Sequence, residues 1–172
     1  MTSSQPPRFI RIKLNPSREK LWSKIKTLEE TLKAIDSKSL NGSQLKALEI
    51  CWDYLQEAWQ FLSDRPWYQS WRSRHPHLVW ELLHRVDEEL LLLYPEEELY
   101  SRALEIKAYF DLNILPEKLR QEWLGPKGQF PRILDEVKQR KNLEENRRLL
   151  RRALKLVNEQ VDRSFWQLSV NT

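Results

Sequence analysis

The chain has 172 residues, the size of one domain, and its 40% hydrophobic and 31% charged residues suffice for a folded core and exclude a disordered tail. Its three glycines are too few for glycine-rich phosphate loops or for sheets joined by many tight turns, because both need backbone at positive φ. The net charge is only +4. The single cysteine cannot form an internal disulfide, which predicts a cytoplasmic protein. No stretch approaches the roughly 18 apolar residues of a membrane span, so no transmembrane segment is predicted.

The first two predicted elements are an extended arm and a helix. Apolar and basic residues alternate from Arg8 onward, so residues 1–14 are predicted to be extended. Pro16 follows a capping asparagine and starts a helix whose leucines and isoleucines recur every three or four residues as far as Ile35. An Asn-Gly turn that ends at Gly42 then separates this helix from the next one.

A second helix is predicted to begin at Ser43, whose side chain can cap it. Leucines and tryptophans then follow at alternating steps of three and four residues up to Leu62. This pattern is typical of a seam that packs against neighbouring helices. Trp52 and Trp59 belong to the seam and are therefore predicted to lie in the core.

Proline and glycine divide the middle of the chain. A proline-bounded connector precedes a third helix, which is predicted to start at Pro76. Pro95 starts a fourth helix, because proline is tolerated in a first turn and the three glutamates after it suit the positive end of the helix dipole. A short fifth helix is predicted from Pro116 to about Leu124, where a Gly-Pro-Lys-Gly sequence ends it.

The C-terminal part contains neither proline nor glycine after Pro131, so one helix is predicted over 131–168, roughly 57 Å long. One arc of this helix is basic and consists of Arg147, Arg148, Arg151, Arg152 and Lys155. The opposite arc is an apolar seam that includes Leu154, Val161 and Phe165. A helix of this length is expected to protrude from a bundle of shorter helices and to offer both arcs to a partner.

These elements predict an all-α fold, a single-domain helical bundle of five to six helices over residues 15–172, with a long C-terminal helix. Charge is sorted along it, since basic residues dominate the N-terminus and the last helix while acidic residues dominate 81–105. One interpretation is that helices of opposite charge pack side by side or that each charged run faces solvent. The other is a two-faced molecule whose basic end binds an anionic partner.

The predicted connector interleaves aromatic and basic side chains: Arg65, Trp67, Tyr68, Trp71, Arg72 and Arg74. Rings that stack on bases and guanidinium groups that hold phosphates are what single-stranded nucleic acid requires. Alternatively, the aromatic rings cover one end of the bundle and the arginines extend to water. Together with the basic arc, the connector makes nucleic-acid binding an alternative function.

Four residues separate Arg72 from His77, and this spacing resembles the active-site motif of HEPN ribonucleases, which are also small helical bundles. The resemblance covers six residues and implies that Arg72 and His77 would serve RNA cleavage. Pro76 and Ser73, which lie within the motif, depart from the family pattern. Arg72 and His77 are the catalytic candidates of this chain.

Glu81 and His84 have the Glu-x-x-His spacing of a di-iron bundle. Such a site needs a second pair from another helix, and all three histidines lie between positions 75 and 84. No metal site and no cofactor are therefore predicted.

The sequence favours a non-catalytic helical interaction module, meaning an adaptor, regulatory or scaffolding domain that binds a protein partner or a second copy through its long basic C-terminal helix. The alternative is a nucleic-acid-binding protein, which includes a HEPN-like ribonuclease. An anionic membrane surface is a further partner that the basic arc would suit. Phosphate binding by several arginines would weaken steeply with salt, whereas docking on the apolar seam would not.

Overall fold

The computed structural model describes residues 17–63, 75–112 and 114–170, and for residues 75–76 and 164–170 it describes the backbone alone. All its regular elements are helical, which confirms the predicted all-α bundle with a long C-terminal helix. The predicted arm, residues 1–14, and nearly all of the connector lie outside the described residues. The helices are α1 (Arg18–Lys33), the short 3-10 helix η1 (Ser37–Ser39), α2 (Gly42–Ser63), α4 (His75–Leu90), α5 (Glu96–Asp111), α6 (Glu117–Leu124), α7 (Gln129–Lys138) and α8 (Leu143–Val170).

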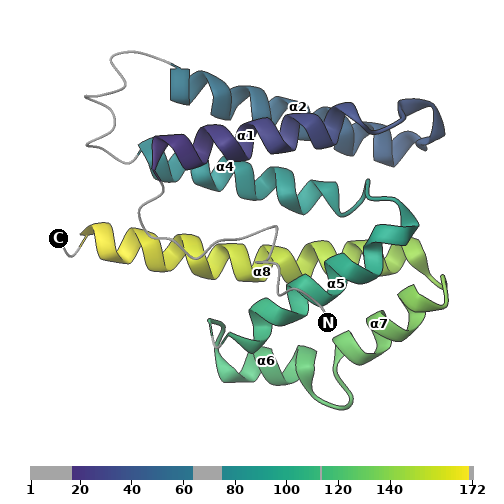
Figure 1. Cartoon of the computed structure of the whole chain (residues 1–172). Helices are drawn as coiled ribbons and strands as arrows, with labels where there is room; N and C mark the ends of the chain where they lie inside the picture. Colours follow the sequence, from purple (N-terminus) through teal and green to yellow (C-terminus); the bar gives the residue numbers. More distant parts are fainter. Residues whose placement is uncertain (1–16, 64–74, 113, 171–172) are drawn as a thin grey trace, which may run out of the picture.

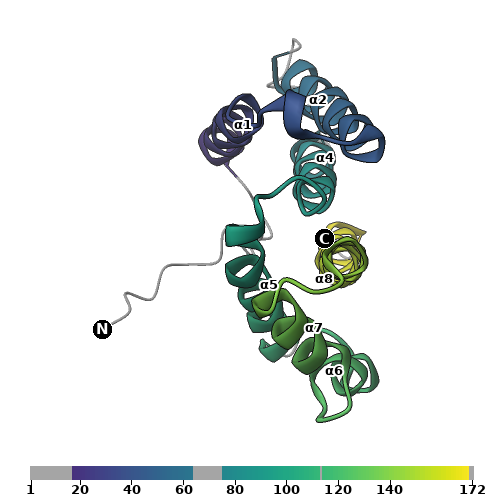
Figure 2. The ribbon, with the colours of Figure 1, turned by 90° about the vertical axis from the view of Figure 1, so that its right-hand side faces the viewer.

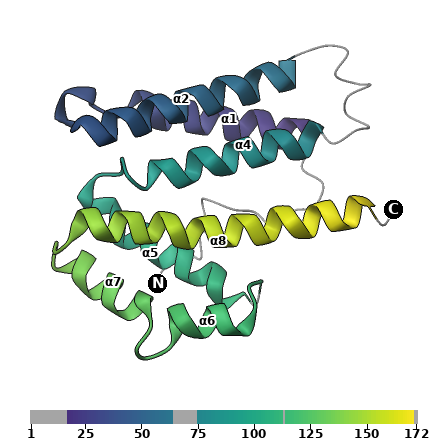
Figure 3. The same ribbon diagram turned by 180° about the vertical axis from the view of Figure 1, so that it is seen from behind.

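The helices form layers on either side of α8 (Figures 1 and 2). Helices α1, α2 and α4 lie together on one side, and α4 packs along α8. Helices α5, α6 and α7 lie on the other side of α8. Seen from behind, α8 runs along most of the length of the molecule between these two groups (Figure 3). Helix α8 therefore joins the two halves of the fold.

Helix α1 has the predicted apolar stripe, but it begins two residues later than predicted, at Arg18 rather than at Pro16. The Ser17 side chain caps it by accepting a hydrogen bond from the Lys20 backbone N–H at 3.2 Å. Its leucines and isoleucine at steps of three and four residues, from Leu21 to Leu32, are all buried. The cap and the apolar stripe thus fix where α1 begins and which side faces the core.

An aromatic cluster holds α5, α6 and α7 together. Phe110 of α5 lies with its ring centroid 5.7 Å from that of Trp123 in α6 and 5.0 Å from that of Phe130 in α7. Trp123 and Phe130 are 5.6 Å apart, so the three rings contact one another in tilted or edge-on geometry. All three residues are buried. The cluster gives α5, α6 and α7 a core of their own beside α8.

The prediction of one helix over 131–168 is wrong, because the chain turns between α7 and α8. Arg140 and Asn142 have left-handed backbone, with φ of 58° and 49°. The N–H of Lys141 bonds to the Glu136 carbonyl at 2.8 Å and that of Arg140 to the Val137 carbonyl at 3.1 Å. This is a Schellman end, with arginine at the left-handed position that glycine usually takes. The long C-terminal helix therefore begins at residue 143.

No helix among the described residues combines the length and the apolar content that crossing a membrane requires.

Candidate functional site

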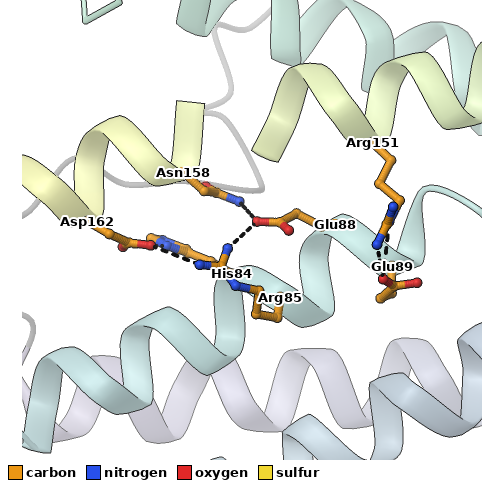
Figure 4. Close-up of polar contacts among 7 residues, drawn as sticks. All are labelled: His84, Arg85, Glu88, Glu89, Arg151, Asn158 and Asp162. Atoms are coloured by element: carbon orange, nitrogen blue, oxygen red, sulfur yellow. Dashed lines mark hydrogen bonds and ion pairs between the residues drawn. The ribbon is translucent and has the colours of Figure 1, made fainter. Parts of the chain in front are cut away.

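A buried polar seam joins α4 to α8 (Figure 4). His84 of α4 is 1% exposed, and its Nδ1 lies 3.0 Å from Oδ1 of Asp162 in α8. A carboxylate only accepts, so Nδ1 carries the proton of this hydrogen bond. The edge of the Trp80 ring packs against the imidazole, with centroids 5.2 Å apart. The histidine is held in one orientation by an acid on one side and a ring on the other.

Glu88 is the second point of the seam. It accepts a hydrogen bond from Arg85 Nη1 at 2.7 Å, one turn away on α4, and another from Asn158 Nδ2 of α8 at 2.9 Å. Arg85 also lies 3.8 Å from Asp162. Burial would lower the pKa of Arg85, but the charges of Glu88 and Asp162 outweigh burial and raise it. The guanidinium is thus held in its charged form between two acids.

The basic arc of α8 is divided by the same packing. Arg151 donates through Nη2 to Glu89 of α4 at 2.6 Å, and Arg147 donates to the Leu91 carbonyl at 3.2 Å. Burial lowers the pKa of Arg147, and the charge of Glu96 opposes that effect. Arg151 therefore binds α4, and Arg147 binds the turn that follows α4. This pairing agrees with the interpretation that helices of opposite charge pack side by side.

The other three members of the arc, Arg148, Arg152 and Lys155, remain exposed on the outer side of α8. Arg148 makes an ion pair with Glu144 of its own helix at 2.9 Å, in which both side chains are largely in water. Such exposed pairs stabilise little. These three side chains are the most exposed part of the arc.

The apolar residues predicted to bind a partner are in the core of this chain. Leu154 is 0% and Val161 is 4% exposed, so the expectation that they present a docking face is wrong for this conformation. The side chain of Phe165 lies outside the described residues. The expectation failed because the sequence shows that α8 has an apolar arc but not that α4, α5 and α7 cover it.

Among the candidates from the connector and the HEPN-like motif, only His77 lies within the described residues. Arg65, Trp67, Tyr68, Trp71, Arg72 and Arg74 all lie outside the described residues. His77 lies in the first turn of α4 and is half-buried. Burial lowers the pKa of His77 to about 4, although the charge of Asp162 opposes this shift. His77 is therefore neutral near pH 7.

The predicted Glu81 and His84 pair belongs to the polar seam, where His84 binds Asp162. Within residues 17–63, 75–112 and 114–163, no three His, Cys, Asp or Glu side chains are grouped as a metal site would need. What the seam does chemically is fix the register of α4 against α8, since His84 and Arg85 of α4 face Asp162 of α8 and Glu88 accepts from Asn158 across a buried interface.

A groove between α1 and α2 exposes tryptophan. It has a volume of about 270 Å³, and Trp52 and Trp59 of α2 lie along it opposite Ile25 and Glu29 of α1. Trp59 is 49% exposed, so the prediction that it is in the core is wrong. Trp22 of α1 contacts it edge-on, with centroids 6.3 Å apart.

The groove follows one row of the α2 seam. Leu55 and Leu62 of that seam are buried, as predicted. In the other row, at intervals of seven residues, Leu45 is 44% exposed, Trp52 is half-buried and Trp59 is half in water. A half-exposed row beside a buried one means that α1 and α4 cover only part of the apolar face of α2.

Comparison of the chain with protein families, with curated proteins and with solved structures finds no match in any of the three. The geometry of the described residues is therefore the basis for the functional argument that follows.

Proposed function

We propose that this protein is a non-catalytic helical interaction module that binds an amphipathic helix of a protein partner in the groove between α1 and α2. The observation that carries the proposal is the exposure of Trp59 in that groove, 49% of its surface. Large apolar side chains in contiguous surface grooves mark interaction sites, and tryptophan is over-represented among residues that dominate binding energy. The α8 seam named by the sequence is not used, because Leu154 and Val161 are buried.

The half-exposed apolar row of α2, which runs from Leu45 to the two tryptophans that line the groove, favours a helical partner. Leu45, Trp52 and Trp59 are seven residues apart, so they form a row about 21 Å long on one side of α2. A partner helix with apolar residues at heptad spacing would place one side chain against each of them. Docking would complete the coiled-coil-like seam that the chain itself leaves half covered.

Acidic residues near the groove indicate that the partner helix should be basic. The outer flank of α2 carries Glu49, Asp53 and Glu57, and all three are exposed. On the α1 side, Glu29 faces the groove and pairs with Lys33 at 2.9 Å. A partner helix with lysine or arginine beside its apolar row would face the acids of α2.

A synthetic helical peptide tests the proposal. It would carry leucine at heptad spacing and lysine at the flanking positions, and its binding to the full chain would be followed by tryptophan fluorescence and calorimetry. Trp59→Ala should weaken binding at least about tenfold, since truncating a central anchor typically costs more than about 1.4 kcal/mol. Tyr100→Ala is the matched control, because Tyr100 is also exposed, at 37%, but lies on α5.

Two results would contradict the proposal: equal affinity of the wild type and Trp59→Ala, or equal loss in the Tyr100→Ala control. Sedimentation of the unliganded chain identifies another occupant. A dimer that Trp59→Ala abolishes would mean that a second copy, not a foreign helix, covers the groove.

Nucleic-acid binding stays the second candidate because Arg148, Arg152 and Lys155 remain exposed on α8. Fluorescent single-stranded RNA would be titrated with the full chain at low and moderate salt. The candidate requires affinity that falls steeply with salt and is lost in Arg148→Glu with Arg152→Glu. Unchanged RNA affinity in that double variant would reject it, and anionic vesicles run in parallel would separate a membrane surface from RNA.

A further inference from the structure

A second concave surface lies on the other flank of α1. A cleft of about 560 Å³ is formed by α1, η1 and the corner between α4 and α5. In the end-on view, α1 and α5 stand on the same side of α4 and border this region (Figure 2). Its volume is within the range of small-molecule sites. Apolar side chains, among them Leu28, Leu40 and Leu93, form part of the wall.

Asp87 of α4 lines the cleft as a buried acid. It is 1% exposed, and its Oδ1 accepts a hydrogen bond from Lys24 Nζ at 3.1 Å. Its Oδ2 is buried and has no hydrogen-bond partner among the described residues. A buried carboxylate with one oxygen lacking a donor is costly, and Asp87 lines the cleft, so a cation bound there would stabilise its charge.

Burial raises the pKa of Asp87 to about 6, against the opposing charges of Lys24 on α1 and His84 on its own helix, while Glu88 raises it further. Cys51 of α2 also interacts electrostatically with this carboxyl, and burial, Glu89 and Asp87 raise the pKa of its thiol above its usual range. The Asp87 carboxylate is ionised at pH 7, but the neighbouring positive charges do not fully offset the effect of burial. A further cation in the cleft would therefore stabilise the ionised form.

Three hydroxyl groups on the wall present only lone pairs to the cleft. The hydroxyls of Thr27, Thr31 and Ser39 each donate to a backbone carbonyl, of Ser23, Thr27 and Asp36 respectively, and each bond is 2.9 Å long. A hydroxyl has a single proton, so these oxygens can only accept from a ligand. The C-terminal turn of α1 also lines the cleft, and the last carbonyl groups of a helix carry partial negative charge.

The two basic residues in the wall already have acids. Lys24 binds Asp87, and Arg102 of α5 binds Glu105 at 2.6 Å and Glu98 at 3.5 Å. The guanidinium of Arg102 also lies over the Tyr94 ring, 4.7 Å from its centroid. Asp36 adds another carboxylate to the wall. The cleft therefore offers acceptors and a surplus of negative charge next to an apolar surface.

From these contacts we infer that the cleft binds an aliphatic primary ammonium group, which donates to the Asp87 carboxylate and to the hydroxyl oxygens of α1 while its alkyl chain packs on the leucines. An ammonium suits the site because its three donors can reach acceptors on different helices. The group can come from a free alkylamine or from a lysine side chain of a peptide. This site is separate from the tryptophan groove and does not depend on it.

The test is titration of the full chain with n-butylammonium chloride, followed by calorimetry and by the NMR signal of the Asp87 carboxyl carbon. Saturable binding with a Kd on the order of 1 mM is expected for so small a ligand. n-Butanol and butyrate should bind at least about tenfold more weakly, because they lack the charge that the acids select. In the presence of saturating amine the pKa of Asp87 should fall below about 6.

Variants assign the binding to this cleft. Asp87→Asn should weaken butylammonium binding at least about tenfold, while Glu97→Gln, which removes the same charge from an exposed position on α5, should leave it unchanged. Thr31→Val keeps the shape of a half-buried side chain and removes one acceptor, so a loss of about threefold is expected. If Asp87→Asn does not fold, Thr31→Val and the pKa of Asp87 decide the question.

Equal binding of butanol and butylammonium, or no effect of the cleft variants, would overturn the inference. Equal losses in Asp87→Asn and Glu97→Gln would also overturn it, because they would reflect the net charge of the protein. Capped lysine distinguishes the source of the group. Binding at least as tight as that of butylammonium would assign the cleft to a lysine side chain, and binding of butylammonium alone would assign it to a free amine.

Discussion

Helices α8 and α2 both carry apolar residues at steps of three and four, but their apolar faces are buried to different extents. The seam of α8 is enclosed, with Leu150, Leu154 and Val157 at 0% exposure and charged residues bound to α4 along one edge. The seam of α2 is enclosed along one row only, and Leu45 and Trp59 remain about half exposed. Equal patterns thus lead to unequal burial. The difference teaches that the uncovered row, and not the more amphipathic helix, is where a partner should be sought.

The largest expected effect comes from breaking the polar edge of α8. Glu88→Ala removes the acid between Arg85 and Asn158 and leaves a half-buried guanidinium short of a partner, so it should lower the free energy of unfolding by about 3–5 kcal/mol. Urea denaturation measures the change. Glu144→Ala, which removes the acid of the exposed pair with Arg148, is the control and should have no measurable effect. Similar losses in both variants would contradict the assignment of the seam as structural.

The same substitution on the two seams sharpens the comparison directly. Leu154→Ala opens a cavity at a fully buried position and should cost about 2–5 kcal/mol of unfolding free energy. Leu45→Ala removes the same atoms from a residue that is 44% exposed and should cost less than about 1 kcal/mol. Both are read from denaturant midpoints. Comparable costs would mean that the α2 row is covered in solution.

A smaller effect is expected where α8 begins. Arg140→Gly places glycine at a left-handed position, φ 58°, where a Cβ is unfavourable, so unfolding free energy should rise by about 0.5–1 kcal/mol. Gln139→Gly, one residue earlier and at φ −86°, has no such strain to relieve and should lower it instead. Thermal denaturation of the pair decides the point. A loss of stability in Arg140→Gly would argue against a Schellman end here.

The smallest net effect concerns pH, because two opposite pKa shifts lie on the two faces of α4 and partly cancel. His77, beside Asp162 of α8, has a folded pKa of about 4 against an ordinary 6.5, so its contribution to stability is present above 6.5 and is lost as pH falls toward 4. Asp87, on the α1 face, has a pKa of about 6 against 3.8, so its contribution is present below 3.8 and is lost as pH rises through 6. The two slopes oppose each other between these values.

Single substitutions separate the contributions of His77 and Asp87, and urea denaturation at pH 4.5 and 6.5 measures them. Relative to wild type, His77→Gln should be less sensitive to acid, and Asp87→Asn should be more sensitive to it. If neither substitution changes the pH dependence, the two groups titrate in the folded protein as they do in the unfolded chain.

Much of the fold could be predicted, because its signals are local. Pro95 and Pro116 set helix starts through backbone geometry within one turn, as predicted, whereas the cap of α1 is Ser17 and was predicted at Asn15. The turn at Arg140 was missed since neither glycine nor proline marks it. The strain of a left-handed arginine is small enough for two backbone hydrogen bonds and the packing of α7 and α8 to offset.

The sites could be predicted much less well. The exposure of Trp59 could not be read from the α2 pattern, because periodicity identifies an apolar face but not how much of it a neighbour covers. Asp87 gave no signal at all, since an acid in a helix looks the same in sequence whether it faces water or a cleft. Asp87 and Thr31 of α1 line the same cleft although they lie far apart in the chain, so only the folded structure brings them together.

The amino-acid sequence by itself determined an all-α fold, most helix boundaries and the apolar face of each helix, because propensity, capping and period act over a few residues. Only the tertiary structure decided that Arg151 of α8 binds Glu89 of α4, that the described part of the α8 seam is buried, and that α1 stands between the groove lined by Trp52 and Trp59 and the cleft lined by Asp87. Those outcomes depend on which helices become neighbours. That choice minimises exposed apolar area and unpaired charge over the whole chain at once, which no single segment specifies.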